Sequence, residues 1–205
     1  IKFVQTWEGF VYHMTCRGSR FADGATRNPD GQVFMKNRET DEWLEQNQKA
    51  TRNFIRKWGH FVKHDEYLKP IIPHKYNIGF AIHNCTKEIL HALEPWCSDI
   101  FLTMLQPSDV QGYILEEQKN TKFDLLKKIK PISDEKYNDI IVEFEANELT
   151  QDNIKILFNI QEIITESGEI GQFEIGIFKI TILELKTYEK ELIDIKGKKP
   201  YMEVA

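Results

Sequence analysis

The sequence predicts an α/β protein, with α+β as the open alternative, in which an N-terminal strand, loop and helix precede a small α/β domain. From residue 77 onward, apolar runs of strand length alternate with segments whose apolar residues recur at helical spacing. Before that point, the prolines of residues 69–76 favour an extended linker. We therefore divide the chain into residues 1–72 and residues 73–205.

The N-terminal part begins with an apolar, aromatic run over residues 7–12, which predicts a strand leading to His13. Residues 21–32 contain two Asp-Gly steps and a proline, and these predict a long loop.

A helix is expected to follow from Thr40, which can N-cap it, to Trp58, with Gly59 ending it. The helical period separates an aromatic set from a basic set on this helix. We expect the aromatic residues to be mostly buried and the basic ones mostly exposed: Trp43, Phe54 and Trp58 in the first set, Arg52 and Arg56 in the second.

The second part is predicted to contain three strands separated by helices. The predicted strands cover residues 77–84, 98–104 and 138–147. The predicted helices cover residues 86–96, stopped by Pro95; from a capping box at Ser108 to about Glu117; and from an N-cap at Thr150 to Gly168.

Residues 171–183 alternate first in one phase and then in the other, and a bulge near Gly176 would reconcile the two halves. The charged residues of 187–199 predict a solvated terminal helix and tail.

Composition narrows the class of protein. The chain of 205 residues is 41% hydrophobic and 29% charged, which is enough for a substantial core. It has no apolar stretch of membrane-spanning length and no secretory leader, so we expect no membrane span and a cytoplasmic location. Its net charge of −5 argues against a nucleic-acid partner. Three cysteines without a CxxC pair fit reduced thiols.

The residues that most strongly suggest a binding site follow the first predicted strand. His13 precedes a small basic loop containing Arg17 and Arg20, so an imidazole that can bind a divalent cation lies near two guanidiniums that can grip phosphate. His13 could equally be a partly buried residue with a backbone hydrogen bond. A further set of histidines has no fixed ligand spacing: His74, His83 and His91.

The order of these features resembles a known family. A strand ending in Tyr12-His13, a loop of about 30 residues and a helix containing "RNFIRKWG" is similar to the C-terminal part of the catalytic domain in family 2 glycosyltransferases of the GT-A fold. The resemblance covers about residues 5–60. Within the helix it rests on Arg52, Asn53, Phe54, Lys57, Trp58 and Gly59, with Asn and Arg in reversed order.

The resemblance implies that His13 helps to hold Mn²⁺ or Mg²⁺ and that Arg17 or Arg20 contacts the diphosphate of a nucleotide-sugar donor, while the acceptor is unknown. The family's nucleotide-binding half and its general base should lie upstream of Ile1. We therefore expect this chain to be an inactive, metal-free C-terminal fragment of such an enzyme, with residues 73–205 as an accessory domain. The alternative is a non-enzymatic α/β binding or assembly module on which the helix of residues 40–58 packs.

Overall fold

The computed structural model describes residues 41–67, 69–103 and 106–188. The predicted strand at 7–12, the loop at 21–32, the cap at Thr40 and nearly all of the C-terminal helix and tail lie outside these residues. The chain divides into two compact units, Thr51–Ile195 and a second made of Ile1–Ala50 with Lys196–Ala205. The described fold belongs almost entirely to the first of these units.

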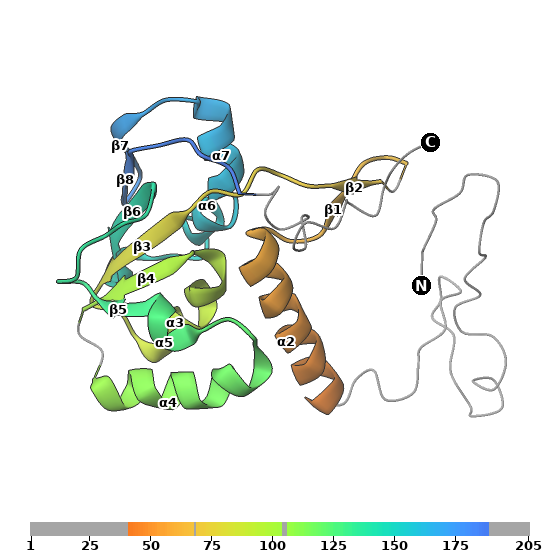
Figure 1. The fold of residues 1–205 in the computed structure, drawn as a ribbon, viewed down its shortest axis with the longest axis vertical. Coiled ribbons are helices and arrows are strands. Elements are labelled where there is room, and N and C mark those ends of the chain that lie inside the picture. The colour runs from red at the N-terminus through yellow and green to blue at the C-terminus, as the bar shows by residue number, and fades with distance from the viewer. Residues whose placement is uncertain (1–40, 68, 104–105, 189–205) are drawn as a thin grey trace, which may run out of the picture. The chain divides into compact units, whose positions relative to one another are not determined.

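A six-stranded mixed sheet forms the centre of this unit (Figure 1). Its order is β5-β4-β3-β6-β8-β7. The first four strands in this order run parallel, whereas β8 is antiparallel to both of its neighbours. The strands are β3 (Ile78–His83), β4 (Asp99–Leu102), β5 (Ile129–Pro131), β6 (Ile140–Glu145), β7 (Gly171–Ile175) and β8 (Phe178–Ile182). The α/β class predicted from the sequence is confirmed.

Helices connect β3 to β4 and β4 to β5, and two further helices precede the final hairpin. Helix α2 (Asp41–Trp58) leads into the sheet domain, and short 3-10 turns extend or separate the later helices. The helices after β3 are α3 (Lys87–Leu93), α4 (Pro107–Glu117), α5 (Leu125–Lys128), α6 (Ile154–Phe158) and α7 (Ile160–Ser167), and the 3-10 turns are η1 (Glu94–Trp96), η2 (Gln118–Asn120) and η3 (Ala146–Glu148).

The main core forms where these helices pack on one face of the sheet. Alternate strand residues point to this face because side chains alternate along a strand. The buried residues of the helices, among them Leu90, Leu157 and Ile164, belong to the same apolar cluster as this set of strand residues. The strand residues are Ile78, Phe80, Ile82, Ile100, Leu102, Ile140, Val142, Phe144, Phe178, Ile180 and Ile182.

The opposite face of the sheet carries a much smaller apolar cluster. Ala81, Phe101 and Ile141 form it, and only Ile132 packs against it from the side. Lys130 and Lys136 each place their ammonium group 5.5 Å from the centre of the Phe101 ring. Parallel strands are usually covered by helices on both faces. Here the described helices bury their apolar residues on one face only, and the other face becomes polar toward the carboxyl ends of β3 and β6.

Three predicted strands and two predicted helix ends are confirmed. The strands correspond to β3, β4 and β6. Thr86 caps α3 by accepting a hydrogen bond from the backbone N–H of Ile89, and α7 ends at Gly168, which is left-handed. The three-residue β5 and four-residue α5 were not predicted, because elements this short leave no periodic pattern to detect.

Two predicted N-caps were wrong in position. Helix α4 begins at Pro107 rather than at Ser108, and its N-cap residue Gln106 makes no side-chain cap bond. Proline suits the first helical position because its missing N–H would be unpaired there. The Thr150 hydroxyl does accept from the N–H of Asn153, but it closes a turn before α6, which starts at Ile154.

The phase change near Gly176 marks a chain reversal, and the predicted bulge was wrong. Ile175 pairs with Phe178, which leaves Gly176 and Ile177 as a two-residue hairpin turn between β7 and β8. Gly176 has a φ of 58°, and glycine at this first turn position is typical of type II′ hairpins. A two-residue reversal shifts the alternation just as an extra bulged residue would, so the sequence pattern alone does not separate the two.

Two short strands lie in and just before the predicted linker of residues 69–76. Strand β1 (Lys63–His64) pairs antiparallel with β2 (Pro70–Ile71). Proline is tolerated in β2 because the pairing there is only two residues long and lies at an edge. Among the described helices, none is both long and apolar enough to cross a membrane.

A glycine in β3 offers a direct test of this packing. A Cβ added at Gly79 would lie 2.4 Å from the Asn138 Oδ1 atom and 3.1 Å from the Phe101 ring. We therefore expect Gly79→Ala to lower the free energy of unfolding by about 1–3 kcal/mol through overpacking. Chemical denaturation measures the change.

The matched control is Gly112→Ala in α4, where an added Cβ meets no atom within 4 Å. This change should raise stability by up to about 1 kcal/mol because alanine favours a helix. Equal effects of the two substitutions would contradict the packing described for Gly79.

Candidate functional site

The residues predicted to bind the metal and the donor diphosphate, His13, Arg17 and Arg20, lie outside the described residues. Their roles remain predictions. Within residues 41–67, 69–103 and 106–188, no group of three or more histidine, cysteine, aspartate or glutamate side chains lies close enough to hold a metal ion.

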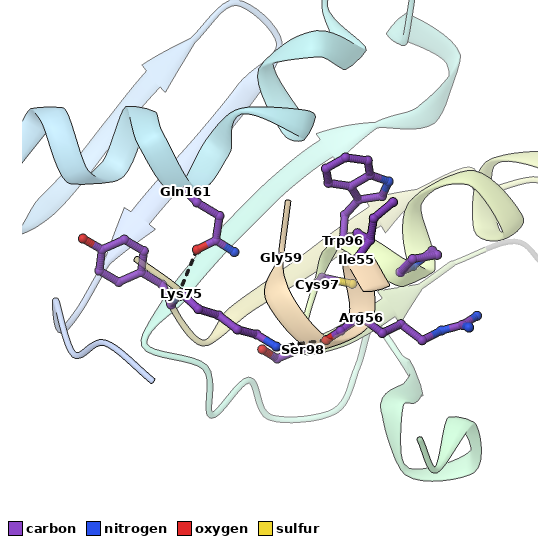
Figure 2. A pocket seen from close by; sticks show the side chains of 10 residues that line it. Ile55, Arg56, Gly59, Lys75, Trp96, Cys97, Ser98 and Gln161 are labelled. Atoms are coloured by element: carbon purple, nitrogen blue, oxygen red, sulfur yellow. Dashed lines mark hydrogen bonds between the residues drawn. The ribbon is translucent and has the colours of Figure 1, made fainter. Parts of the chain in front are cut away.

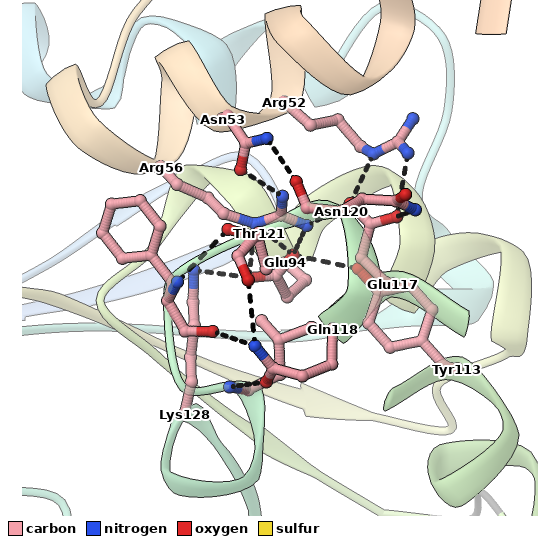
Figure 3. Close-up of polar contacts among 12 residues, drawn as sticks. Arg52, Asn53, Arg56, Glu94, Tyr113, Glu117, Gln118, Asn120, Thr121 and Lys128 are labelled. Carbon is pink, nitrogen blue, oxygen red and sulfur yellow. Dashed lines mark hydrogen bonds and ion pairs between the residues drawn. The ribbon is translucent and has the colours of Figure 1, made fainter. Parts of the chain in front are cut away.

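The predicted basic face of α2 is an internal contact surface, and the expectation that it is exposed was wrong. Arg56 is only 4% exposed and forms an ion pair with Glu94, with 2.6 Å between Nη2 and Oε2 (Figure 3). The same Nη2 atom lies 2.7 Å from Oε1 of Glu117. Arg52 donates to both oxygens of Glu117 through Nε and Nη2, at 2.9 and 2.8 Å.

The aromatic residues of α2 are less covered than expected. Trp43 is 39% exposed, and Phe54 and Trp58 are half-buried. Ile55 is the buried apolar residue in this part of the helix, at 3% exposure. The buried stripe of α2 thus consists of Ile55 and Arg56, which sequence hydropathy alone does not select.

Glu94 is the central acceptor of this buried charge network, which comprises Arg52, Arg56, Glu94, Tyr113, Glu117 and Lys128. The Glu94 carboxylate is fully buried in η1 and also accepts from the Tyr113 hydroxyl at 2.9 Å. The Lys128 ammonium lies 2.7 Å from its Oε1 atom. A buried carboxylate requires such partners because desolvation of an unpaired charge costs several kcal/mol.

The pKa values within the network agree with its geometry. Burial alone would raise the pKa of Glu94, but Lys128 and Arg56 lower it below its usual range. Burial opposes ionisation of Glu117 as well, yet hydrogen bonds from Arg52 and Arg56 lower its pKa to about 2. Burial would lower the pKa of Arg56, but Glu94 and Glu117 raise it instead. Glu94, Glu117 and Arg56 are therefore charged around neutral pH and form ion pairs with one another. These ion pairs hold the C-terminal end of α2 against the sheet domain.

A small pocket beside this network is lined by another cation, the partly buried Lys75 (Figure 2). The Lys75 ammonium donates to the carbonyls of Arg56 and Lys57 at 2.9 and 2.6 Å, and so satisfies two carbonyls at the C-terminus of α2. Burial, followed by the nearby charges of Lys128 and Lys57, lowers its pKa to about 8. A lysine with this pKa can serve as a base, but the hydrogen bonds to Arg56 and Lys57 give Lys75 the role of a helix C-cap.

Gly59 ends α2 as predicted and lines the same pocket. Its φ is 79°, and an added Cβ would lie 2.7 Å from the amide nitrogen of the buried Gln161 side chain. The other end of that amide accepts a hydrogen bond from the backbone N–H of Tyr76 at 2.9 Å. Gly59 therefore ends the helix and leaves room for the Gln161 side chain. Gln161 in turn binds the backbone of Tyr76, just before β3.

The three histidines without ligand spacing do not come together. The rings of His74 and His91 lie against those of Tyr76 and Tyr113, and His83 pairs with Glu143. A fourth histidine, His60, is 5% exposed. Its Nδ1 atom contacts the carbonyl oxygen of Phe61, so Nδ1 carries the proton, and its buried Nε2 atom has no hydrogen-bond partner.

Several partly exposed polar residues lie together at the carboxyl ends of the central parallel strands. His83 and Asn84 end β3, Thr103 follows β4, and Glu143 and Glu145 belong to β6; we call these five residues the β3–β6 polar cluster. His83 Nε2 lies 2.9 Å from Oε1 of Glu143, and Asn84 Nδ2 donates to Oε2 of Glu145 at 2.7 Å.

The strand order places this cluster at a topological switch point. The chain continues from β3 to β4 on one side and later returns to β6 on the other side. In open α/β sheets, ligands generally bind outside the carboxyl ends of strands at such a point. Sequence reasoning missed the cluster because Glu143 and Glu145 read as the polar positions of an alternating strand.

Asn84 fixes the geometry of the cluster. It is the one non-glycine residue with positive φ among the described residues, at 54°. Its backbone N–H donates to the Thr103 hydroxyl at 3.0 Å, while its side chain is held by Glu145. Left-handed residues other than glycine are uncommon and often lie at functional sites.

Comparisons with known proteins do not assign a family. No family model matches the sequence, and no significant match is found among curated proteins or among solved structures. The class defined by the described residues is an α/β domain with a mixed six-stranded sheet and a polar cluster at its switch point.

Removal of the central cation should test the buried charge network. We expect Arg56→Met to lower the free energy of unfolding by about 3–5 kcal/mol, because it leaves Glu94 buried with fewer partners. Adding Glu94→Gln should cost less than the sum of the two single changes, because the uncompensated carboxylate is then absent. Urea denaturation of the single and double variants measures both effects.

The control is Lys49→Ala, which removes an exposed i,i+4 pair with Glu45 on α2. Its effect should stay within about 0.5 kcal/mol. An Arg56→Met variant as stable as this control would show that the network does not fasten the helix.

His60 should make stability depend on pH. Burial lowers its pKa below 6.5, and Lys63 and Lys75 lower it further, although the Phe61 carbonyl and Glu162 oppose this. As pH falls through about 6.5, the unfolded chain takes up a proton that the folded chain does not, so stability should fall. Denaturation between pH 8 and pH 5 measures the slope, and His60→Phe should reduce it. An unchanged slope in His60→Phe would contradict this assignment.

Proposed function

We propose that this chain is the C-terminal portion of a nucleotide-sugar-dependent glycosyltransferase, with the α/β domain as an accessory domain. The observation that carries the proposal is the segment from Arg52 to Gly59, which matches the family's helix by residue type. Residues 52–58 of this segment lie in α2, and Gly59 follows the helix.

The proposed roles follow residue by residue from the resemblance. His13 contributes one ligand to a divalent cation, and Arg17 or Arg20 contacts the donor diphosphate. A divalent cation with arginines stabilises the negative charge that develops on a departing nucleoside diphosphate. One histidine supplies too few ligands for a stable site, so the other ligands come from the remainder of the enzyme.

The buried charge network bears on the role of the α/β domain. Arg52 and Arg56, which lie inside the family-like helix segment, bind Glu94 and Glu117 of the α/β domain. The helix and the domain therefore form one compact unit over Thr51–Ile195.

The same contact also favours the second candidate, a non-enzymatic binding or assembly module. In that case α2 serves only to complete the α/β domain, and no donor site exists. The sequence that precedes Ile1 in the full-length protein discriminates between the two candidates. A nucleotide-binding βαβ segment with an Asp-x-Asp-like motif supports the enzyme, whereas its absence supports the module.

His13→Ala in the full-length protein tests the proposed enzyme. Mn²⁺-dependent binding of a nucleotide sugar should be lost or fall at least about tenfold, because one metal ligand is removed. Calorimetric titration with and without Mn²⁺ measures the affinity. The control is His64→Ala, which removes an exposed histidine of β1 and should leave binding unchanged. Equal metal dependence in both variants would contradict the role of His13.

A further inference from the structure

A short arm lies between α2 and β3, outside the six-stranded sheet. This β1–β2 arm comprises residues 60–72, of which 60–67 and 69–72 are described. Its paired strands are two residues long, and a hairpin of this size is marginally stable at best by itself. Within the described part of the arm, His60 alone is buried, at 5% exposure. The position of the arm therefore depends on how His60 is held.

The surroundings of the His60 ring accommodate its neutral form. Nδ1 donates to the carbonyl oxygen of Phe61, and the Phe54 ring of α2 lies edge to face, with 6.0 Å between the ring centroids. Nε2 is buried and has no hydrogen-bond partner among the described residues. In the neutral ring this atom is an acceptor, whereas protonation makes it a donor that carries positive charge. A buried charged donor without a partner costs more than an unpaired neutral acceptor.

The charged groups that face the ring act in both directions. Lys63 of β1 and Lys75, which precedes β3, disfavour a further positive charge, whereas Glu162 of α7 favours one. The Glu162 carboxylate is already paired with the Lys63 ammonium. Burial is the largest influence, and it holds the pKa of His60 below 6.5. A protonated ring is therefore more stable in solvent, where its pKa returns to about 6.5.

The residue that follows His60 covers an apolar surface of the sheet domain. The Phe61 ring packs against Trp96, with 4.8 Å between the ring centroids, and Trp96 in turn stacks on Phe158 at 4.4 Å. Trp96 is only 4% exposed, whereas Phe61 is 47% exposed, so Phe61 is the outer layer. Because the Phe61 carbonyl is held by His60, movement of the imidazole into solvent also frees Phe61 to leave Trp96.

We infer that His60 is a pH-sensitive anchor: its protonation releases the β1–β2 arm from the sheet domain and uncovers the apolar surface formed by Trp96 and Phe158. The release is local, because the arm contributes no strand to the central sheet. The inference is independent of the proposed glycosyltransferase function, since it invokes none of the residues proposed for the donor site.

Carbene footprinting of the 205-residue chain tests the release, because a photoactivated diazirine labels exposed side chains without requiring a particular pH. Mass spectrometry then gives the labelling of Trp96 and Phe158 at pH 7.5 and pH 5.5. We expect labelling to be about three- to tenfold higher at pH 5.5. The upper limit is the change produced by one group that titrates near 6.5 when exposed and stays neutral when buried. Phe80 of β3 is fully buried and should stay unlabelled at both pH values.

His60→Phe keeps an aromatic ring beside Phe54 and removes the titratable group, so labelling of Trp96 should then differ less than about twofold between the two pH values. The matched control is His64→Phe on β1. The Nδ1 atom of His64 also contacts the carbonyl oxygen of the next residue, at 2.9 Å, but this histidine is exposed. It should keep the rise of the parent chain, because an exposed imidazole titrates alike in the attached and released arm.

The inference is overturned by a rise of less than about twofold in the parent chain, or by a rise that persists in His60→Phe. Labelling of Phe80 in parallel with Trp96 also overturns it, because the acid-induced change is then global unfolding. If His60→Phe does not fold, His60→Asn decides by the same criterion. Its neutral side-chain amide can donate to the Phe61 carbonyl in place of Nδ1.

Discussion

The burial of the Glu94 carboxylate is the constraint on which the rest of the described structure depends. Glu94 lies in η1, between α3 and β4, and is fully covered. Three charged or polar groups from α2, α4 and α5 converge on it: Arg56, Tyr113 and Lys128. Because an unpaired buried carboxylate is strongly unfavourable, these elements must adopt positions that satisfy it. The network therefore links the helices to the sheet with a geometric specificity that apolar contacts alone do not impose.

The burial of Glu94 also changes how the helix segment that resembles the glycosyltransferase helix is interpreted. Its arginines have the residue types of a phosphate-binding surface, but the structure directs Arg52 and Arg56 inward to Glu117 and Glu94. Both arginines are consequently engaged in ion pairs within the unit Thr51–Ile195 and are not available to an anionic ligand.

The two faces of the sheet divide structural and functional roles. The face covered by helices holds the main core and the buried charge network near its border. The other face has a small apolar cluster around Phe101 and becomes polar at the carboxyl ends of β3 and β6. Accessible acceptor groups can persist there because solvent compensates their polarity in the absence of a ligand.

The sequence by itself determined the α/β class, the strands β3, β4 and β6, and the ends of α2 and α7, because these depend on local periodicity and on glycine at positions with positive φ. It did not reveal the hairpin at Gly176, since a turn and a bulge shift the alternation equally. Only the tertiary structure showed that Arg56 is buried, because its partner Glu94 lies 38 residues away. The β3–β6 polar cluster was hidden for the same reason. His83 and Glu143 are 60 residues apart, and only the pairing of parallel strands brings them together.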